Sequence, residues 1–297
     1  MNNSLKAGII SGLIAGIISA IVYEIFSNIA VLIGLYDPWL HPLVLGNIVV
    51  NIPLFGFWGI ILGIIYSRIY DIIPRKGVLK GLIYGLFLYF IVGIRLDTFL
   101  LPYGLFLWAA GDAFSEFFMW ILYGLVLGYL FELLHIKYNI PKELKKIVQY
   151  DMMSGIFPGA IAGFFGGLAA SFFAVLGSLT GSWGYIIEGE VISVIDLWIS
   201  QAGTHIVINM IWGTIFGALF AKVYNLVPGK KVIKGLCYGL IMFLITTLQF
   251  TTWAICMWAN HNLWDLVLAE ILGLSIGGAN ATIFGLVLGL LYRKPSK

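Results

Sequence analysis

Residues Trp58–Leu86 read WGIILGIIYSRIYDIIPRKGVLKGLIYGL, and residues Trp212–Leu240 read WGTIFGALFAKVYNLVPGKKVIKGLCYGL. The two stretches are offset by 154 residues, and they share Trp, Gly, Tyr, Pro and Lys at the same spacing. Chance similarity between apolar segments pairs Leu with Ile, but it does not pair Trp, Pro and Lys together. The sequence therefore indicates a tandem duplication, so that an inference about one half can be checked in the other.

The composition is that of an integral membrane protein. Of the 297 residues, 61% are hydrophobic and 10% are charged, and the mean hydropathy is +0.99. Soluble domains carry about 25% charged residues, so the composition excludes an ordinary soluble protein. No soluble domain is left over beside the apolar segments.

Eight apolar stretches are long enough for a bilayer-crossing helix, which needs about 20 residues. We expect an all-α polytopic membrane protein with eight transmembrane helices in two four-helix tandem repeats. The repeats are parallel, because an even number of spans gives both the same orientation. They cover 1–138 and 151–297, joined by a cationic, amphipathic cytoplasmic linker at 139–150. The stretches lie near residues 7–34, 43–67, 78–98, 112–134, 153–178, 199–221, 232–257 and 264–292.

The distribution of charge predicts the topology. Lys and Arg concentrate in segments that alternate with segments nearly free of them. The positive-inside rule then places both termini in the cytoplasm, and most Trp residues fall at the opposite interface, as an aromatic belt would. We expect a multi-pass protein in the cytoplasmic membrane of a prokaryote.

Two repeated patterns leave alternatives open. Glycines recur four residues apart, as in Gly8-x3-Gly12-x3-Gly16 and again in Gly155-x3-Gly159-x3-Gly163. Such faces let helix backbones approach closely in lipid, either within one bundle or in a homodimer. The loop pattern Tyr-x3-Pro-x-Lys-x3-Lys-Gly favours a tight turn with topology-setting lysines. The alternative is a cytoplasmic site for phosphate groups or a partner.

Polar side chains inside the spans are costly in lipid and carry a functional hypothesis. The predicted topology puts almost all of them in the outer half of the membrane. At the offset of 154, polar residues coincide in four pairs, which are Asn47 with Gln201, Asn51 with His205, Arg95 with Gln249, and Glu116 with Glu270. The candidate substrate- or ion-binding residues are Glu24, Asn47, Asn51, Arg95, Glu116, Gln201, His205, Asn209 and Glu270.

We expect these residues to line a polar cavity that opens to the outer side. Glu116 and Glu270 would be its acidic members, His205 its imidazole, and Arg95 a buried counter-charge. The alternative is a set of hydrogen bonds between helices, with residues near the span ends reaching the interface.

No cofactor or metal site is expected. Haem between helices needs paired axial His, and only His205 lies inside a predicted span. The sequence contains no metal-ligand spacing and no nucleotide-binding glycine loop. We assign no catalytic residue, and we expect the lipid bilayer rather than a nucleic acid as partner.

The pattern His205-x7-Gly213-x3-Gly217, Tyr224, Pro228 and Lys234-Gly-x2-Tyr-Gly, together with the glycine-rich openings of spans 1 and 5, resembles the YagU-like group of small four-span membrane proteins. The resemblance covers each repeat once. It implies that the chain is a fused pair of four-span units. The first repeat departs from it, with Asn51 at the position of His205.

Two functions suit these observations. The first is a small transporter or permeation protein for protons, cations or a small polar solute, in which Glu116 and Glu270 titrate or coordinate ions. His205 would relay protons or bind substrate. The rival is a non-catalytic subunit that anchors or completes a larger membrane complex. Other subunits of such a complex, or further copies of the chain, are the possible protein partners. A third class, an enzyme with an outward-facing intramembrane site, is also open.

Overall fold

The computed structural model describes residues 3–35, 47–94, 106–137, 152–179, 194–248 and 263–293. These residues are helical almost throughout and contain no β-strand. The chain divides into two compact units, Met1–Lys146 and Ile147–Lys297. The predicted linker at 139–150 lies outside the described residues.

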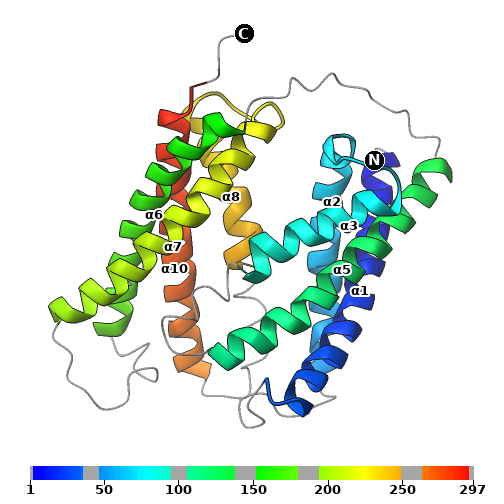
Figure 1. Ribbon diagram of the computed structural model, residues 1–297, viewed down its shortest axis with the longest axis horizontal. Coiled ribbons are helices and arrows are strands. Elements are labelled where there is room, and N and C mark those ends of the chain that lie inside the picture. Colours follow the sequence, from blue (N-terminus) through cyan, green and yellow to red (C-terminus); the bar gives the residue numbers. More distant parts are fainter. Residues whose placement is uncertain are drawn as a thin grey trace. The chain divides into compact units, whose positions relative to one another are not determined.

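The first unit contains α1 (Asn3–Leu32), α2 (Asn47–Ile69), the 3₁₀ turn η1 (Tyr70–Ile72), α3 (Val78–Leu88), the π-helical segment η2 (Tyr89–Ile94) and α5 (Phe106–Lys137). Helix α1 packs along α2 and α5, and α5 also packs along α3 (Figure 1). The start of α1 and the turn between α2 and α3 lie at the same end of the unit (Figure 1).

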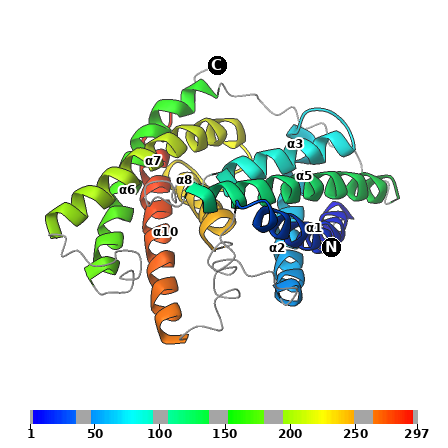
Figure 2. The same ribbon diagram turned by 60° about the horizontal axis from the view of Figure 1, so that its bottom comes forward.

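The second unit contains α6 (Met153–Leu179), α7 (Val194–Val223), α8 (Val232–Met242), the π-helical segment η4 (Phe243–Leu248) and α10 (Leu263–Leu291). Its helices contact one another in the same order as those of the first unit. Helix α6 packs along α7 and α10, and α10 packs along α8 (Figure 2). In both units, therefore, two long helices each lie between two neighbours, and the short helix lies at one edge.

Six helical segments are long and apolar enough to cross a membrane, which fits a membrane protein. The sequence predicts eight spans, and the two that fall short are the apolar segments Val78–Ile94 and Val232–Thr247. In both, α-helix gives way to π-helix, and the described part of the segment ends a few residues later. The six are Asn3–Leu32, Asn51–Ile72, Ala110–Lys137, Met153–Phe173, His205–Val223 and Gly273–Leu291.

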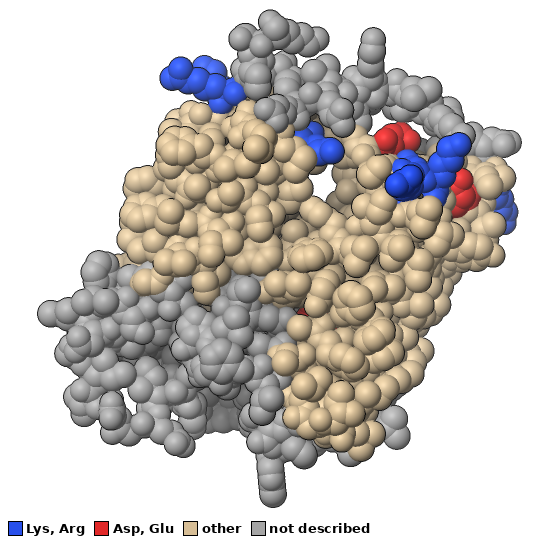
Figure 3. Space-filling model, viewed as in Figure 1, with Lys and Arg blue, Asp and Glu red and all other residues tan. Residues whose placement is uncertain are grey.

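The outer surface of the helices is apolar. Large side chains such as Leu32, Phe57 and Phe157 are exposed along them, and 73% of the surface of Phe157 is accessible. On the face in Figure 3, Lys and Arg gather at one end of each unit and leave the helix bodies uncharged. An apolar wall with charges at its end suits helices surrounded by lipid.

Glycine brings the first two helices of each unit into backbone contact. A Cβ on Gly12 would overlap the carbonyl oxygen of Gly59, and a Cβ on Gly159 would overlap that of Gly213. Lipid gives apolar helices no hydrophobic reason to associate, so close packing of small residues supplies the attraction.

A lysine closes the turn that follows the second helix of each unit, buried at Lys80 and half-buried at Lys234. The Lys80 Nζ donates to the Tyr70 carbonyl and lies 3.9 Å from the centroid of the Tyr70 ring. In the second unit, the Lys234 Nζ donates to the Tyr224 carbonyl at 2.6 Å and lies 4.6 Å from that ring. The last carbonyls of a helix have no partner inside it, so each lysine supplies a donor that the fold needs.

Candidate functional site

The polar residues of the first unit lie at the end of a glycine row on α1. Gly8, Gly12 and Gly16 are four residues apart and meet the backbone of α2. Residues four apart share one face of a helix, so the same row continues through Ala20 to Glu24. The row that packs α1 against α2 therefore ends by directing a carboxylate toward α2.

Glu24 meets Asn51 between these two helices. Its side chain is 4% exposed, that of Asn51 is 0% exposed, and the Asn51 Nδ2 donates a hydrogen bond to the Glu24 Oε1. The amide carries no charge, so this bond does not neutralise an ionised carboxylate. Among the described residues, no Lys or Arg pairs with Glu24. A buried carboxylate without a counter-charge is costly, so within this part of the chain the pair needs a proton or a cation.

A second row on α1 faces α5 and is also polar. It contains Ser19, Tyr23 and Ser27, all buried. The Tyr23 hydroxyl donates to the Asp112 Oδ1 of α5 at 3.1 Å. The Ser19 and Ser27 hydroxyls have no hydrogen-bond partner among the described residues. Polar groups thus join α1 to both of its neighbours at the level of Glu24.

Glu116 lies one turn after Asp112 on α5. Its Oε2 accepts a hydrogen bond from the Trp120 Nε1 at 3.2 Å. The same oxygen lies against Gly93 in the π-helical segment η2, where a Cβ would overlap it. A π-helical turn shifts the register of the residues within it, and such turns are frequent at functional sites.

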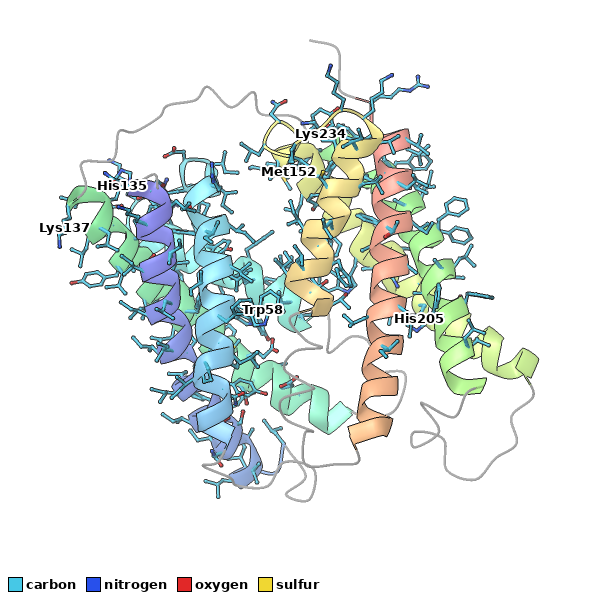
Figure 4. The ribbon with its side chains drawn as sticks, turned by 180° about the vertical axis from the view of Figure 1, so that it is seen from behind. Trp58, His135, Lys137, Met152, His205 and Lys234 are labelled. Carbon is cyan, nitrogen blue, oxygen red and sulfur yellow. The ribbon has the colours of Figure 1, made fainter. Side chains whose placement is uncertain are left out.

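The second unit holds a neutral polar pair instead. The Asn280 Nδ2 of α10 donates to the Asn209 Oδ1 of α7 at 2.6 Å, and both residues are buried. The Asn209 Nδ2 donates to the His205 carbonyl at 2.8 Å. His205 is buried in α7, in the half of the unit away from Lys234 (Figure 4).

Contacts in the last helix of each unit repeat at an offset of 161, so the predicted match of Glu116 with Glu270 is wrong. Gly81 meets Gly124 and Gly128, whereas Gly235 meets Gly285 and Gly289. At this register, Glu116 corresponds to Gly277 and Asp112 to Gly273.

The first helix of each unit also departs from the offset of 154. Gly12 meets Gly59 where Gly159 meets Gly213, so α1 corresponds to α6 at an offset of 147. Glu24 then corresponds to Ser171. The positions that correspond to Glu24, Asp112 and Glu116 are therefore occupied by Ser or Gly in the second unit.

The structure unites some of the predicted site residues. Glu24 bonds to Asn51, Asn209 bonds to Asn280, and Glu116 packs beside η2. Asn47, Gln201 and Glu270 lie in α2, α7 and α10, with side chains outside the described part, and Arg95 lies wholly outside it. The predicted cavity is not tested by these contacts.

Sequence reasoning missed Tyr23 and Trp120 as partners of carboxylates. Tyr23 could have been found, because the four-residue spacing of Ser19, Tyr23 and Ser27 marks a polar row inside an apolar helix. Trp120 lies four residues after Glu116, a spacing at which helical side chains meet. Neither residue is charged, so neither stands out in a search for charge in the spans.

The described residues contain no group of three or more His, Cys, Asp and Glu that could hold a metal ion. Among these residues, the first unit offers one fully buried carboxylate, Glu24, with neutral oxygen atoms nearby. Such a set can bind a proton, one cation or the polar end of a small solute.

No protein-family model, no curated protein and no solved structure matches this chain.

Proposed function

We propose that the chain is a small membrane transporter or permeation protein for protons, cations or a small polar solute. The observation that carries the proposal is the buried carboxylate of Glu24, which bonds to the uncharged amide of Asn51. A carboxylate inside a membrane helix must be neutralised by a proton or a cation. A group that takes up and releases positive charge at this depth is what a coupled transporter requires.

The proposal includes the arrangement in the membrane. We propose eight spans in two parallel four-helix copies, related to the YagU-like group, with both termini in the cytoplasm of a prokaryote. The recurrence of the glycine and lysine contacts in both units supports this. The charged end of each unit would face the cytoplasm. Glu24, far along α1 from that end, would then lie in the outer half.

The two units would have different roles. The first unit carries Glu24, Asp112 and Glu116, whereas the second carries Ser and Gly at the corresponding positions. We assign binding of positive charge to the first unit. The Asn209–Asn280 pair of the second unit could take part only in neutral hydrogen bonding.

Flux into proteoliposomes tests the proposal. Glu24→Gln keeps the size of the side chain and an oxygen acceptor for Asn51, but it removes the charge. We expect Glu24→Gln to abolish proton- or cation-driven uptake. Glu132→Gln is the matched control, because Glu132 accepts a hydrogen bond from Tyr70 in the same unit, at the charged end. Equal flux through wild type and Glu24→Gln would refute the role of Glu24.

One observation favours the rival function of a membrane-embedded accessory subunit. The Glu24–Asn51 bond joins two helices, and hydrogen bonds of this kind also hold helices together in lipid. Native mass spectrometry of the gently extracted chain distinguishes the two. Stoichiometric co-purification with other subunits would favour the accessory role, whereas a lone monomer or homo-oligomer would favour transport.

A further inference from the structure

We infer that the first unit binds one monovalent metal cation, with Na⁺ as its reference ligand, through oxygen atoms of Glu24, Asn51 and Ser27. The inference rests on the proposed function, since it names the charge that neutralises Glu24. It goes further in specifying the ligand atoms, the valence of the ion and the number of sites in the chain.

The amide of Asn51 supplies the first argument. Its Nδ2 donates to Glu24, but its Oδ1 is fully buried and has no hydrogen-bond partner among the described residues. The two atoms are bonded to the same carbon, so the unpartnered Oδ1 is also close to the Glu24 carboxylate. A buried carbonyl oxygen without a partner costs about 1–3 kcal/mol, and a bound cation would remove that cost.

Ser27 supplies the second argument. Serine in a helix commonly bonds to a carbonyl of the preceding turn, as Ser11 does to Ala7 at 2.6 Å and Ser115 does to Gly111 at 2.9 Å. The hydroxyl of Ser27 is buried and makes no such bond. Ser27 follows Glu24 by three residues, and side chains at that spacing are neighbours on a helix. Although Ser27 belongs to the row that faces α5, it adjoins Glu24 on the helix surface, and its unpartnered oxygen is the next buried ligand atom that α1 supplies.

The chemistry of these atoms selects the ion. Carboxylate, amide and hydroxyl oxygens are hard ligands that suit alkali and alkaline-earth cations. Of the three ligand residues only Glu24 carries a charge, so a monovalent ion balances this ligand set, whereas a divalent ion would leave one excess charge on it. A proton adds only one donor and can satisfy one orphan oxygen, while a metal cation can be shared by several.

The second unit offers no equivalent site. The residues that correspond to Glu24 and Ser27 are Ser171 and Ala174, and His205 replaces Asn51. The Ser171 hydroxyl donates to the Leu168 carbonyl at 2.8 Å, so it is already paired within its own helix. The described residues thus provide one site of this kind, and substitutions in the second unit serve as controls.

Thermal unfolding of the purified full-length chain, followed by Trp fluorescence, tests the inference without any transport assay. NaCl replaces choline chloride at constant ionic strength, so that general salt effects cancel. We expect Tm to rise with Na⁺ and saturate as for a single site, because a ligand that binds only the folded state stabilises it. Glu24→Gln should abolish the rise, and Ser27→Ala should weaken apparent affinity by about tenfold, equal to about 1.4 kcal/mol.

Ser171→Ala and Glu132→Gln are the matched controls and should keep the full Na⁺ response. The inference is overturned if Na⁺ leaves the Tm of wild type unchanged, or if Glu24→Gln keeps the response. It is also overturned if Ca²⁺, at the same concentration of positive charge, raises Tm as much as Na⁺ does. Failure of transport is separable from failure of binding. A Na⁺-dependent Tm without flux would mean a structural cation, and proton flux without a Na⁺ effect would leave the transporter but remove this site.

Discussion

Glu116 of α5 fits against Gly93 of η2 because residue 93 has no side chain. A Cβ at that position would overlap the Glu116 Oε2. The second unit reverses the arrangement, since Thr247 of η4 fills the space in front of Gly277 of α10. Gly93 corresponds to Thr247, and Glu116 corresponds to Gly277. Each unit thus pairs one side chain with one glycine, from opposite helices.

This exchange predicts a compensating pair of substitutions. Gly93→Thr alone should destabilise the protein by about 1–3 kcal/mol, the usual cost of overpacking, because it displaces the Glu116 carboxylate. Gly93→Thr combined with Glu116→Gly recreates the arrangement of the second unit and should recover most of the loss. Thermal unfolding of the two single variants and the double variant measures the coupling. If the two effects simply add, the contact does not constrain residue 93.

The glycine rows predict a strong dependence of stability on position. Gly12→Val should lower the free energy of unfolding by more than the usual cost of overpacking, which is about 1–3 kcal/mol. The added side chain would meet the Gly59 backbone oxygen, which cannot rotate away as a side chain could. Gly203→Ala is the control, since nothing lies within 4 Å of its added Cβ. That substitution should change stability by less than about 1 kcal/mol. Equal unfolding temperatures for the two variants would refute close packing of α1 on α2.

Much of the fold follows from the repeated stretches. The pattern Tyr-x3-Pro-x-Lys-x3-Lys-Gly predicts the turn between the second and third helices, and in both units the second lysine of the pattern closes that turn. In the fourth helix, the match of Glu116 with Glu270 was wrong, because a single offset of 154 was carried across a connection that is longer in the second unit. The sequence GLVLG, present at Gly124–Gly128 and Gly285–Gly289, contains the correct offset of 161.

The candidate site was harder to predict than the helices. Composition and depth single out Glu24 and Asn51 as polar residues in apolar helices, but neither reveals that they bond to each other. That pairing depends on the axial position of α1 relative to α2, which is set by the glycine contacts. The π-helical segments were not predicted either. The pattern of apolar residues in a sequence does not distinguish one turn of π-helix from α-helix.

The two lysines of the turn after α2, Lys80 and Lys76, should differ in their contribution to stability. Lys80→Met keeps the apolar stem but removes the donor to the Tyr70 carbonyl. A hydrogen bond from a charged group contributes about 1.5–3 kcal/mol, so we expect a fall in stability of that order. Lys76→Met is the control, since Lys76 is exposed in the same turn. Chemical unfolding should show little change for Lys76→Met, and equal losses in both variants would contradict a specific role for Lys80.

The Asn209–Asn280 bond predicts a measurable coupling between α7 and α10. Side-chain hydrogen bonds between membrane helices contribute about 0.6 kcal/mol on average and up to about 1.7. The short 2.6 Å distance and the burial of both residues favour the upper part of that range. Asn209→Ala and Asn280→Ala, alone and combined, should lose less stability together than the sum of the separate losses.

The control for this cycle pairs Asn280→Ala with Thr214→Ala. Thr214 lies on α7 and bonds to the Met210 carbonyl of its own helix, so its loss should add independently to that of Asn280. Unfolding free energies in one detergent at one temperature give both couplings. A coupling near zero for Asn209 with Asn280 would mean that the two amides do not hold α7 to α10, and the polar contact of the second unit would lose its structural role.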